Sequence, residues 1–254
     1  MKIAALYDIH GNVHALRAVL ADVAREQPDA IVIGGDIVLG PFPLETLALL
    51  EELRSDVRYI RGNTEREVLS AGTPSAEMAL PWAQRAAWVR GCLSPAQAEF
   101  LGGLPEQLVL DVDGLGPTLF CHGSPRRDDE IVTYLTTEER LSDIVHGVKQ
   151  RAVVLGHTHV QFDRSAAGIR VMNSGSVGMA YEKEPGAYWA LLGDERVLRH
   201  SGYDVQAAAT AVSSSGFPDA EDFARRILLE PSSPEHASVF FEHRALDQAK
   251  SARS

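Results

Sequence analysis

The chain has 254 residues, 45% of them hydrophobic, which is enough to fill the core of one large domain. Its formal net charge of −11 argues against binding long nucleic acid, because that requires clustered Lys and Arg. No stretch approaches the roughly 20 consecutive apolar residues of a membrane span, and the sequence opens without a basic region followed by a long apolar segment. We therefore expect a cytoplasmic protein that binds neither membranes nor long nucleic acid.

The N-terminal part of the chain predicts three successive strand–helix units. Short apolar runs at residues 2–7, 30–33 and 57–60 each end near Gly, Asp or Asn, and segments with helical spacing follow the first two. Asn12 is placed to cap the first of these helices. Such units predict a mostly parallel sheet with ligands at the carboxyl ends of its strands.

The next segment, about residues 70–105, has a different character, with two of the three tryptophans. It fits either a small helical insertion that caps a site or a further pair of packing helices, and we weigh the two evenly. Apolar positions then alternate from Leu108, which predicts antiparallel strands. A helix at residues 137–148, with Thr136 and Glu139 as a capping box, interrupts these strands.

The C-terminal part, about residues 204–254, predicts two helices followed by a polar tail with Ser and Pro. We expect the whole chain, residues 1–254, to form a single domain whose sheet has a parallel half and a meandering half.

Residues that can bind metal ions follow five of the predicted strands. Asp8 and His10 lie two positions apart after the first strand, so both side chains can point to the same side. The full set is Asp8, His10, Asp36, Asn63, His122, His157 and His159. Its number and mixture of oxygen and nitrogen donors suit two divalent ions such as Mn, Fe, Ni, Co or Zn. Asp36, from the middle strand, is the natural bridge between them.

The ordered motifs "DIHGN", "GGD", "GN", "HGSP", "GHTH" and "NSGSVG" resemble the calcineurin-like metallophosphoesterase superfamily, and within it the bacterial and archaeal phosphodiesterase branch. The resemblance extends from Asp8 to about Gly178. It implies an α/β fold in which two packed mixed β-sheets are flanked by helices, as a four-layer αββα sandwich. The active site then lies at the strand ends.

The resemblance also implies how the donors are shared between two ions. One ion would be held by Asp8, His10, Asp36 and His159, and the other by Asp36, Asn63, His122 and His157. Of these, Asp36, Asn63 and His122 would also be catalytic. The implied activity is hydrolysis of small phosphodiesters, or of phosphomonoesters and nucleotide-like substrates, by a hydroxide that the ions generate from water.

One position departs from the family pattern. Many members have a histidine directly after Gly-Asn that protonates the leaving group, whereas this chain has Thr64, followed by an acidic residue, Glu65. We therefore expect a preference for substrates with acidic leaving groups, such as aryl esters. His14 is a speculative substitute acid; the alternative is a surface histidine.

Two other functions fit the same pattern. A catalytically silent scaffold on this fold, like the retromer subunit that resembles these enzymes, would bind partner proteins, but such scaffolds tend to lose the ligand set that is complete here. A protein that binds or senses a single metal ion would not need Asp36 as a bridge.

Overall fold

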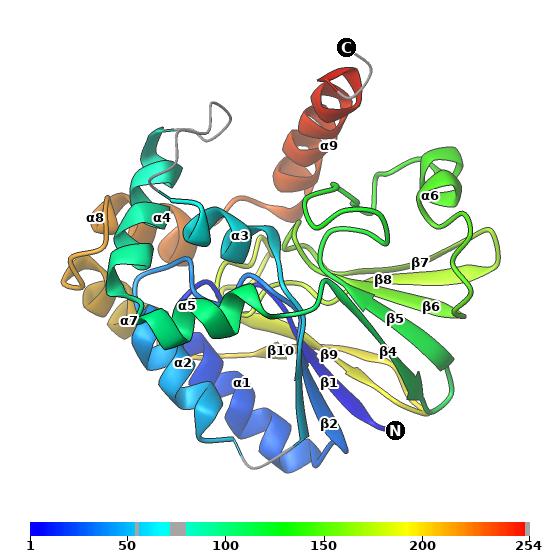
Figure 1. Ribbon diagram of the computed structural model, residues 1–254, viewed down its shortest axis with the longest axis horizontal. Coiled ribbons are helices and arrows are strands. Elements are labelled where there is room, and N and C mark those ends of the chain that lie inside the picture. Colours follow the sequence, from blue (N-terminus) through cyan, green and yellow to red (C-terminus); the bar gives the residue numbers. More distant parts are fainter. Residues whose placement is uncertain (54–55, 72–79, 252–254) are drawn as a thin grey trace.

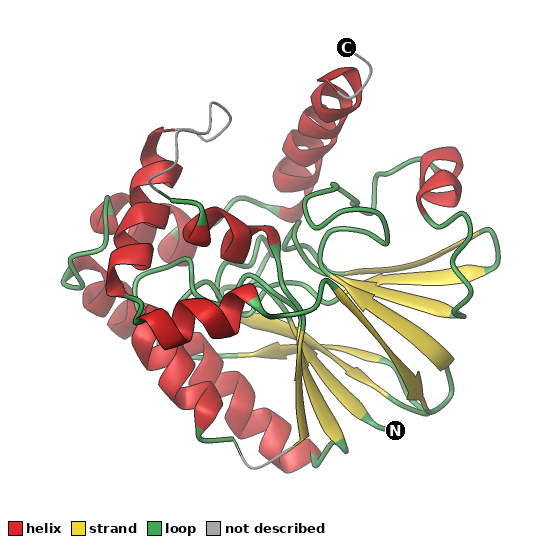
Figure 2. Cartoon of the chain, in the orientation of Figure 1, coloured by secondary structure: helices red, strands yellow, loops and turns green. Residues whose placement is uncertain are grey.

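The structure is a computed structural model that describes residues 1–53, 56–71 and 80–251. Two five-stranded sheets face each other, and helices lie outside them (Figures 1 and 2). This arrangement confirms the predicted α/β sandwich of two mixed sheets. Among the described residues, no helix combines the length and the apolar character that a membrane crossing requires.

The first sheet has the strand order β10-β9-β1-β2-β3. Its strands are β1 (Ile3–Leu6), β2 (Ala30–Ile33), β3 (Asp56–Tyr59), β9 (Ala187–Leu192) and β10 (Val197–Ser201). The three predicted N-terminal strands do pair in parallel. The expected division into a parallel half and a meandering half is wrong, however, because β9 pairs antiparallel with β1 and carries β10 into this sheet.

The second sheet has the order β4-β5-β6-β8-β7. Its strands are β4 (Gln107–Val112), β5 (Gly116–Cys121), β6 (Ala152–Leu155), β7 (Phe162–Ala166) and β8 (Ile169–Asn173). Strand β6 pairs in parallel with β5 on one side and with β8 on the other. The edge strands β4 and β7 pair antiparallel with β5 and β8, respectively. Both sheets are therefore mixed.

The hydrophobic core lies on both faces of the first sheet. Along β1 the buried side chains alternate: Ile3, Ala5 and Tyr7 pack between the two sheets, and Ala4 and Leu6 pack under the helices. Because β1 is buried on both faces, its sequence is a continuous run of apolar residues. It also leaves the strand ends as the place where polar side chains can gather.

Most helices contribute buried side chains to the hydrophobic cluster on the outer face of the first sheet (Figure 1). They are α1 (Val13–Glu26), α2 (Pro43–Glu51), α3 (Asn63–Leu69), α4 (Leu80–Cys92), α5 (Pro95–Gly102), α7 (Val205–Ser213) and α8 (Ala220–Phe223), which continues into the π-helix η1 (Ala224–Leu229). As predicted, Asn12 caps α1, since its side chain accepts a hydrogen bond from the amide of Ala15.

Helix α6 (Glu138–Ile144) packs on the outer face of the second sheet. It is shorter than predicted, and its cap is Thr137 rather than Thr136. The hydroxyl of Thr136 instead accepts a hydrogen bond from the amide of Thr133 and donates one to Glu242. A tertiary contact thus decides between two adjacent threonines that the sequence does not distinguish.

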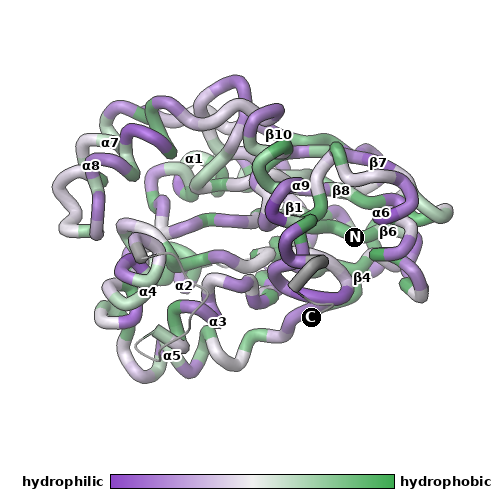
Figure 3. The backbone as a smooth tube through the Cα atoms, turned by 90° about the horizontal axis from the view of Figure 1, so that it is seen from above, coloured by the Kyte–Doolittle hydropathy of each residue, from purple (hydrophilic) through white to green (hydrophobic). Residues whose placement is uncertain are grey.

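The segment predicted as a polar tail is largely helical. Helix α9 spans Pro234–Ser251, and it mixes hydrophilic and hydrophobic positions (Figure 3). Ala237, Phe241 and Ala245 repeat at a spacing of four residues and are buried, so a narrow apolar stripe docks the helix. The polar composition of this segment gave no indication of the apolar stripe. Residues 252–254 of the expected tail lie outside the described residues.

Candidate metal centre

The strand ends bring the predicted donors together through an unusual backbone. Five of the donors adopt left-handed backbone conformations, with φ between 48° and 67°: Asp8, His10, Asp36, His157 and His159. Such conformations cost on the order of 1 kcal/mol or more each in a non-glycine residue, and they persist only where surrounding structure holds them. Strain of this kind at five buried or half-buried polar residues marks a functional site.

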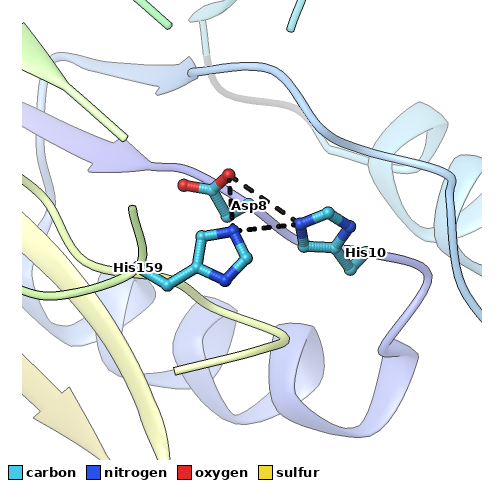
Figure 4. Close-up of side chains that lie close together, drawn as sticks. All are labelled: Asp8, His10 and His159. Atoms are coloured by element: carbon cyan, nitrogen blue, oxygen red, sulfur yellow. Dashed lines mark hydrogen bonds and ion pairs between the residues drawn. The ribbon is translucent and has the colours of Figure 1, made fainter. Parts of the chain in front are cut away.

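Asp8, His10 and His159 form the first group of donors (Figure 4). The Nε2 atom of His159 lies 3.2 Å from Oδ1 of Asp8 and 3.2 Å from Nε2 of His10. The Nε2 atom of His10 is 3.8 Å from the same carboxylate oxygen. Two nitrogen ligands about 2.1 Å from one tetrahedral ion lie roughly 3.4 Å apart, so these separations fit a shared cation.

Backbone carbonyls orient both imidazoles of this group. Nδ1 of His10 lies 3.1 Å from the carbonyl oxygen of Leu39, and Nδ1 of His159 lies 2.9 Å from that of Met179. We assign the ring proton to Nδ1 in each case, because only a donor can face a carbonyl there. The Nε2 lone pairs then face each other inside the group, and a bound cation would relieve their repulsion.

Asp36, His122 and His157 form the second group. Nδ1 of His122 lies 2.8 Å from the carbonyl oxygen of Gly34, and its Nε2 lies 3.3 Å from Oδ1 of Asp36. The other carboxylate oxygen of Asp36, Oδ2, lies 3.6 Å from Nε2 of His10 in the first group. Asp36 therefore presents one oxygen to each group.

Asn63 lies beside the second group at the start of α3. The following residue, Thr64, donates its amide to Oδ1 of Asp36 at 2.9 Å. The side-chain nitrogen of Asn63 donates to Glu67, while its Oδ1 is buried without a hydrogen-bond partner. The same is true of Oδ1 of Asp8 and Nε2 of His122. Buried polar atoms without partners are costly, and all three belong to predicted metal ligands.

The charges in the centre are strongly coupled. Burial alone would raise the pKa of Asp36, but the nearby imidazoles of His122 and His10 hold it well below its usual range. Burial alone would lower the pKa of His122, but Asp36 and Asp8 raise it to about 10. Burial lowers the pKa of His10 and of His157 to about 4. Without cations, His122 thus carries a proton between two ionised carboxylates.

The buried side chain of Glu65 fixes the loop that carries Asp36. It accepts hydrogen bonds from the backbone amides of Asp36, Ile37 and Gly62 at 2.7 to 2.9 Å. Burial, followed by the charge of Asp36, raises its pKa to about 7. Gly62 must remain a glycine, because a Cβ there would lie 2.2 Å from Oδ1 of Asp36.

The "NSGSVG" segment supports the centre from behind. The hydroxyl of Ser176 donates to the backbone carbonyl of Asp8 at 2.8 Å and accepts from the amide of Met179. The side-chain nitrogen of Asn173 donates to the carbonyl of Gly156 at 2.6 Å. These contacts hold the loops that carry Asp8, His157 and His159, and they engage Ser176 with backbone rather than with a base.

The structure does not bring His14 to the donors. It lies in the first turn of α1, where its ring contacts Phe42 at 5.5 Å between centroids, and none of its contacts among the described residues reaches a predicted ligand. Thr64, which replaces the family histidine, is buried, and its hydroxyl has no partner. The proposed acid role of His14 stays a prediction.

Three aromatic rings border the histidines. Trp82 of α4 lies edge-on to His10 at 6.4 Å, Tyr181 stacks on His159 at 5.3 Å, and Phe241 of α9 lies 6.4 Å from His157. None of these three rings belongs to a sequence motif of the site. Trp82 lies within residues 70–105, the segment that fits a cap over the site, so its position in the sequence indicated a place near the centre. Residues 72–79 of that segment lie outside the described part of the chain. The capping role itself stays a prediction.

Comparison with known families shows which family the chain belongs to. A family model described as the calcineurin-like phosphoesterase superfamily domain matches residues 1–195. The chain belongs to this superfamily. The superfamily is one of metal-dependent phosphoesterases, which agrees with the two donor groups and confirms hydrolase as the general class.

One relative of this phosphoesterase is similar in sequence, and two solved structures are similar in fold. An uncharacterized protein of Methanocaldococcus jannaschii is 28% identical over 186 residues, which are 72% of either chain. A hypothetical protein from Pyrococcus horikoshii has a TM-score of 0.79 at 19% identity and covers 91% of this chain and 99% of its own. A metallophosphoesterase from Sphaerobacter thermophilus has a TM-score of 0.71 at 24% identity, with 89% and 98% covered.

Proposed function

We propose that this phosphoesterase hydrolyses small phosphodiesters with two divalent metal ions, and that phosphomonoesters and nucleotide-like esters are its further substrates. The observation that carries the proposal is the placement of Asp36. Its Oδ1 lies 3.3 Å from Nε2 of His122 and its Oδ2 lies 3.6 Å from Nε2 of His10, so one carboxylate faces both donor groups. A site for a single ion does not require such a carboxylate.

The donors would be shared as follows. Asp8, His10 and His159 would hold one ion, Asn63, His122 and His157 the other, and Asp36 both. Imidazole and carboxylate donors suit Mn, Fe, Ni, Co or Zn. When bound, two such cations lower the pKa of a water molecule and neutralise phosphoryl oxygens.

The chain's own residues orient these parts. Backbone carbonyls hold the rings of His10, His122 and His159 with Nε2 inward. Glu65 holds the Asp36 loop through three amides, which fixes the direction of the bridging carboxylate. With its carbonyl oxygen turned inward, Asn63 would lie next to a phosphoryl oxygen of the substrate. Such preorganised positioning is the main contribution a protein makes to phosphoryl transfer.

The leaving group would depart without a histidine acid, because Thr64 occupies that position. General acid catalysis is worth roughly 10²–10⁴-fold, so substrates with poor leaving groups lose the most. We therefore propose that aryl esters are turned over faster than alkyl esters. A cytoplasmic location and a small-molecule substrate are part of the same proposal.

The test combines metal binding with hydrolysis. The metal-free protein is loaded with each candidate ion in turn, the bound ions are counted, and hydrolysis of mono- and bis-p-nitrophenyl phosphate is compared with that of an alkyl diester. We expect two ions per chain, activity only in the loaded protein, and faster turnover of the aryl diester.

Each part of the proposal has its own contrary result. One ion per chain would favour the single-metal alternative. Two bound ions without hydrolysis of any ester would favour the scaffold. Equal turnover of alkyl and aryl diesters would contradict the leaving-group argument alone.

A further inference from the structure

Asn63 is a predicted ligand that can face an ion with either end of its side-chain amide. The two ends of a side-chain amide have nearly the same shape, but only the carbonyl oxygen can bind a cation. A rotation of the amide by about half a turn would direct its NH₂ group at the ion instead. The enzyme therefore needs a device that distinguishes the two ends, and a backbone carbonyl orients the rings of His10, His122 and His159 but not this amide.

Glu67 supplies a suitable partner on the same helix. It lies four residues after Asn63 on α3, and its Oε1 accepts a hydrogen bond from Nδ2 of Asn63 at 2.9 Å. An ionised carboxylate accepts hydrogen bonds but cannot donate them, so it binds only the NH₂ end of the amide. The Oδ1 atom of Asn63 is thereby turned the other way, where it is buried without a partner.

Trp82 holds the carboxylate in turn. Its indole Nε1 donates to Oε2 of Glu67 at 2.8 Å, so each oxygen of Glu67 accepts from a different donor. The same indole ring lies edge-on to His10, 6.4 Å between centroids. Helix α4 thus contacts a ligand of the first donor group with its ring and reaches a ligand of the second through Glu67.

We propose that Glu67 is a positioning residue that, locked by Trp82, keeps the carbonyl oxygen of Asn63 directed at the second metal ion. This inference rests on the proposed function, since it assigns Asn63 to that ion. It adds two residues, Glu67 and Trp82, to the machinery of the site. Neither residue contacts the reacting atoms.

The substitution Glu67→Gln tests this arrangement, because glutamine keeps the shape but has only one acceptor oxygen. With donors on both sides, its NH₂ group must face either Asn63 or the indole of Trp82. We expect the affinity for the second ion to fall by roughly 10–100-fold, the usual effect of changing a residue that orients a metal ligand. The affinity for the first ion stays within about threefold of the wild type, the ordinary scatter of such effects.

A double substitution provides the decisive comparison. Trp82→Phe keeps an aromatic ring against His10 but removes the second donor. In the Glu67→Gln/Trp82→Phe protein, glutamine can direct its oxygen at Asn63 and its NH₂ group into the space left by the indole nitrogen. We expect this protein to bind the second ion more tightly than Glu67→Gln alone, a rescue that a general packing defect does not give.

Two matched controls accompany these variants. Glu99→Gln removes the same charge from an exposed position on α5. Trp88→Phe makes the same change on α4 at a ring that packs on Phe217. Metal affinities are measured by calorimetry and by competition with a chelator, kcat and KM with bis-p-nitrophenyl phosphate, and folding of each metal-free variant by thermal unfolding. We expect the controls to bind both ions as the wild type does, and Glu67→Gln to lower kcat more than it raises KM.

The outcomes separate the two proposals. If the wild type binds two ions and hydrolyses the ester but Glu67→Gln keeps its affinity for the second ion, only the positioning role is overturned. Independent, additive losses in the double variant overturn it as well. If the wild type binds fewer than two ions, the proposed function itself fails. Should Glu67→Gln not fold, Trp82→Phe alone carries the test: a loss confined to the second ion supports the lock, and no loss refutes it.

Discussion

The two donor groups of the centre differ in what holds them. In the first group, carbonyls of the backbone orient His10 and His159, and all of its side chains are at least nine-tenths buried. In the second group, His157 is only half-buried, and Asn63 depends on two side chains, Glu67 of α3 and Trp82 of α4. Backbone carbonyls alone orient both rings of the first group, whereas one ligand of the second group, Asn63, depends on side chains.

Because of this difference, the two ions can bind with different affinities. A backbone carbonyl next to a buried strand moves only when the core moves, whereas side chains from α3 and α4 can change with their local packing. We therefore expect the first ion to be bound more tightly and the second to be the one that is exchanged.

Replacing the bridging carboxylate of Asp36 should remove the difference in affinity between the two ions, because it weakens the binding of both. In Asp36→Asn, each group loses a charged ligand, so both ions bind more weakly. We expect kcat/KM to fall by roughly 10²–10³-fold or more, because two ions supply several kcal/mol of charge stabilisation. The exposed Asp111→Asn is the matched control. Unchanged activity in Asp36→Asn would exclude the bridging role.

Substituting one histidine from each group should separate the two sites. His157→Ala should weaken only the second ion, by roughly 10–100-fold, and leave one tightly bound ion per chain. His10→Ala should weaken the first. Metal analysis after dialysis against a graded chelator series measures both. If the first ion leaves the wild type before the second does, the assigned order of affinity is wrong.

Proton release provides a third comparison. In the metal-free protein, burial lowers the pKa of His122 but Asp36 and Asp8 raise it to about 10, so at pH 7 the ring is protonated and must lose that proton to bind a metal. The pKa of His10 is about 4, so its ring is already neutral. Loading of the centre with both ions should therefore become about tenfold more favourable per pH unit between about pH 7 and the pKa of His122.

Calorimetry in two buffers of different ionisation enthalpy measures this proton directly. We expect release of about one proton as both ions are loaded into the metal-free protein at pH 7, because one imidazolium must become neutral. A binding enthalpy that is the same in both buffers would show that His122 is not protonated in the metal-free protein.

The smallest effect on activity is expected for a substitution of Ser176, whose hydroxyl donates a hydrogen bond to the backbone carbonyl of Asp8. Ser176→Ala removes one hydrogen bond to the carbonyl of Asp8 and one from the amide of Met179. We expect a loss of about 1–3 kcal/mol in the free energy of unfolding, measured in urea, since buried backbone groups lose their partner. Activity should remain within about tenfold, because the hydroxyl does not react. The exposed Ser213→Ala on α7 is the control.

The convergence of the predicted donor side chains could be expected from the sequence, because their positions depend on local patterns. Asp8, Asp36 and Asn63 follow three short strands that pair in parallel, and parallel strands place their carboxyl ends at one edge of a sheet. His122 and His157 follow β5 and β6, which also pair in parallel. Strand ends with polar residues can thus be recognised from the sequence. The polar side chains at these ends can then be expected to converge.

The aromatic border and the Glu67 contact were not predictable in this way. Tyr181 and Phe241 lie 22 and 82 residues after His159, and only the docking of α9 brings Phe241 to within 6.3 Å of Tyr181 between ring centroids. The same docking selects Thr137 over Thr136 as the cap of α6, since Glu242 engages the hydroxyl of Thr136. Such contacts depend on side chains distant in the sequence.

By itself, the sequence determined the type of chemistry, because residue identity fixes which atoms can bind a cation and strand periodicity fixes the end at which they appear. Tertiary structure alone decided the orientation of those atoms. The left-handed turns at Asp8, His10 and Asp36, and the carboxylate that distinguishes the two ends of the Asn63 amide, exist only when two sheets and the surrounding helices pack together. Orientation is set by contacts between distant segments, and these have no local signature in the chain.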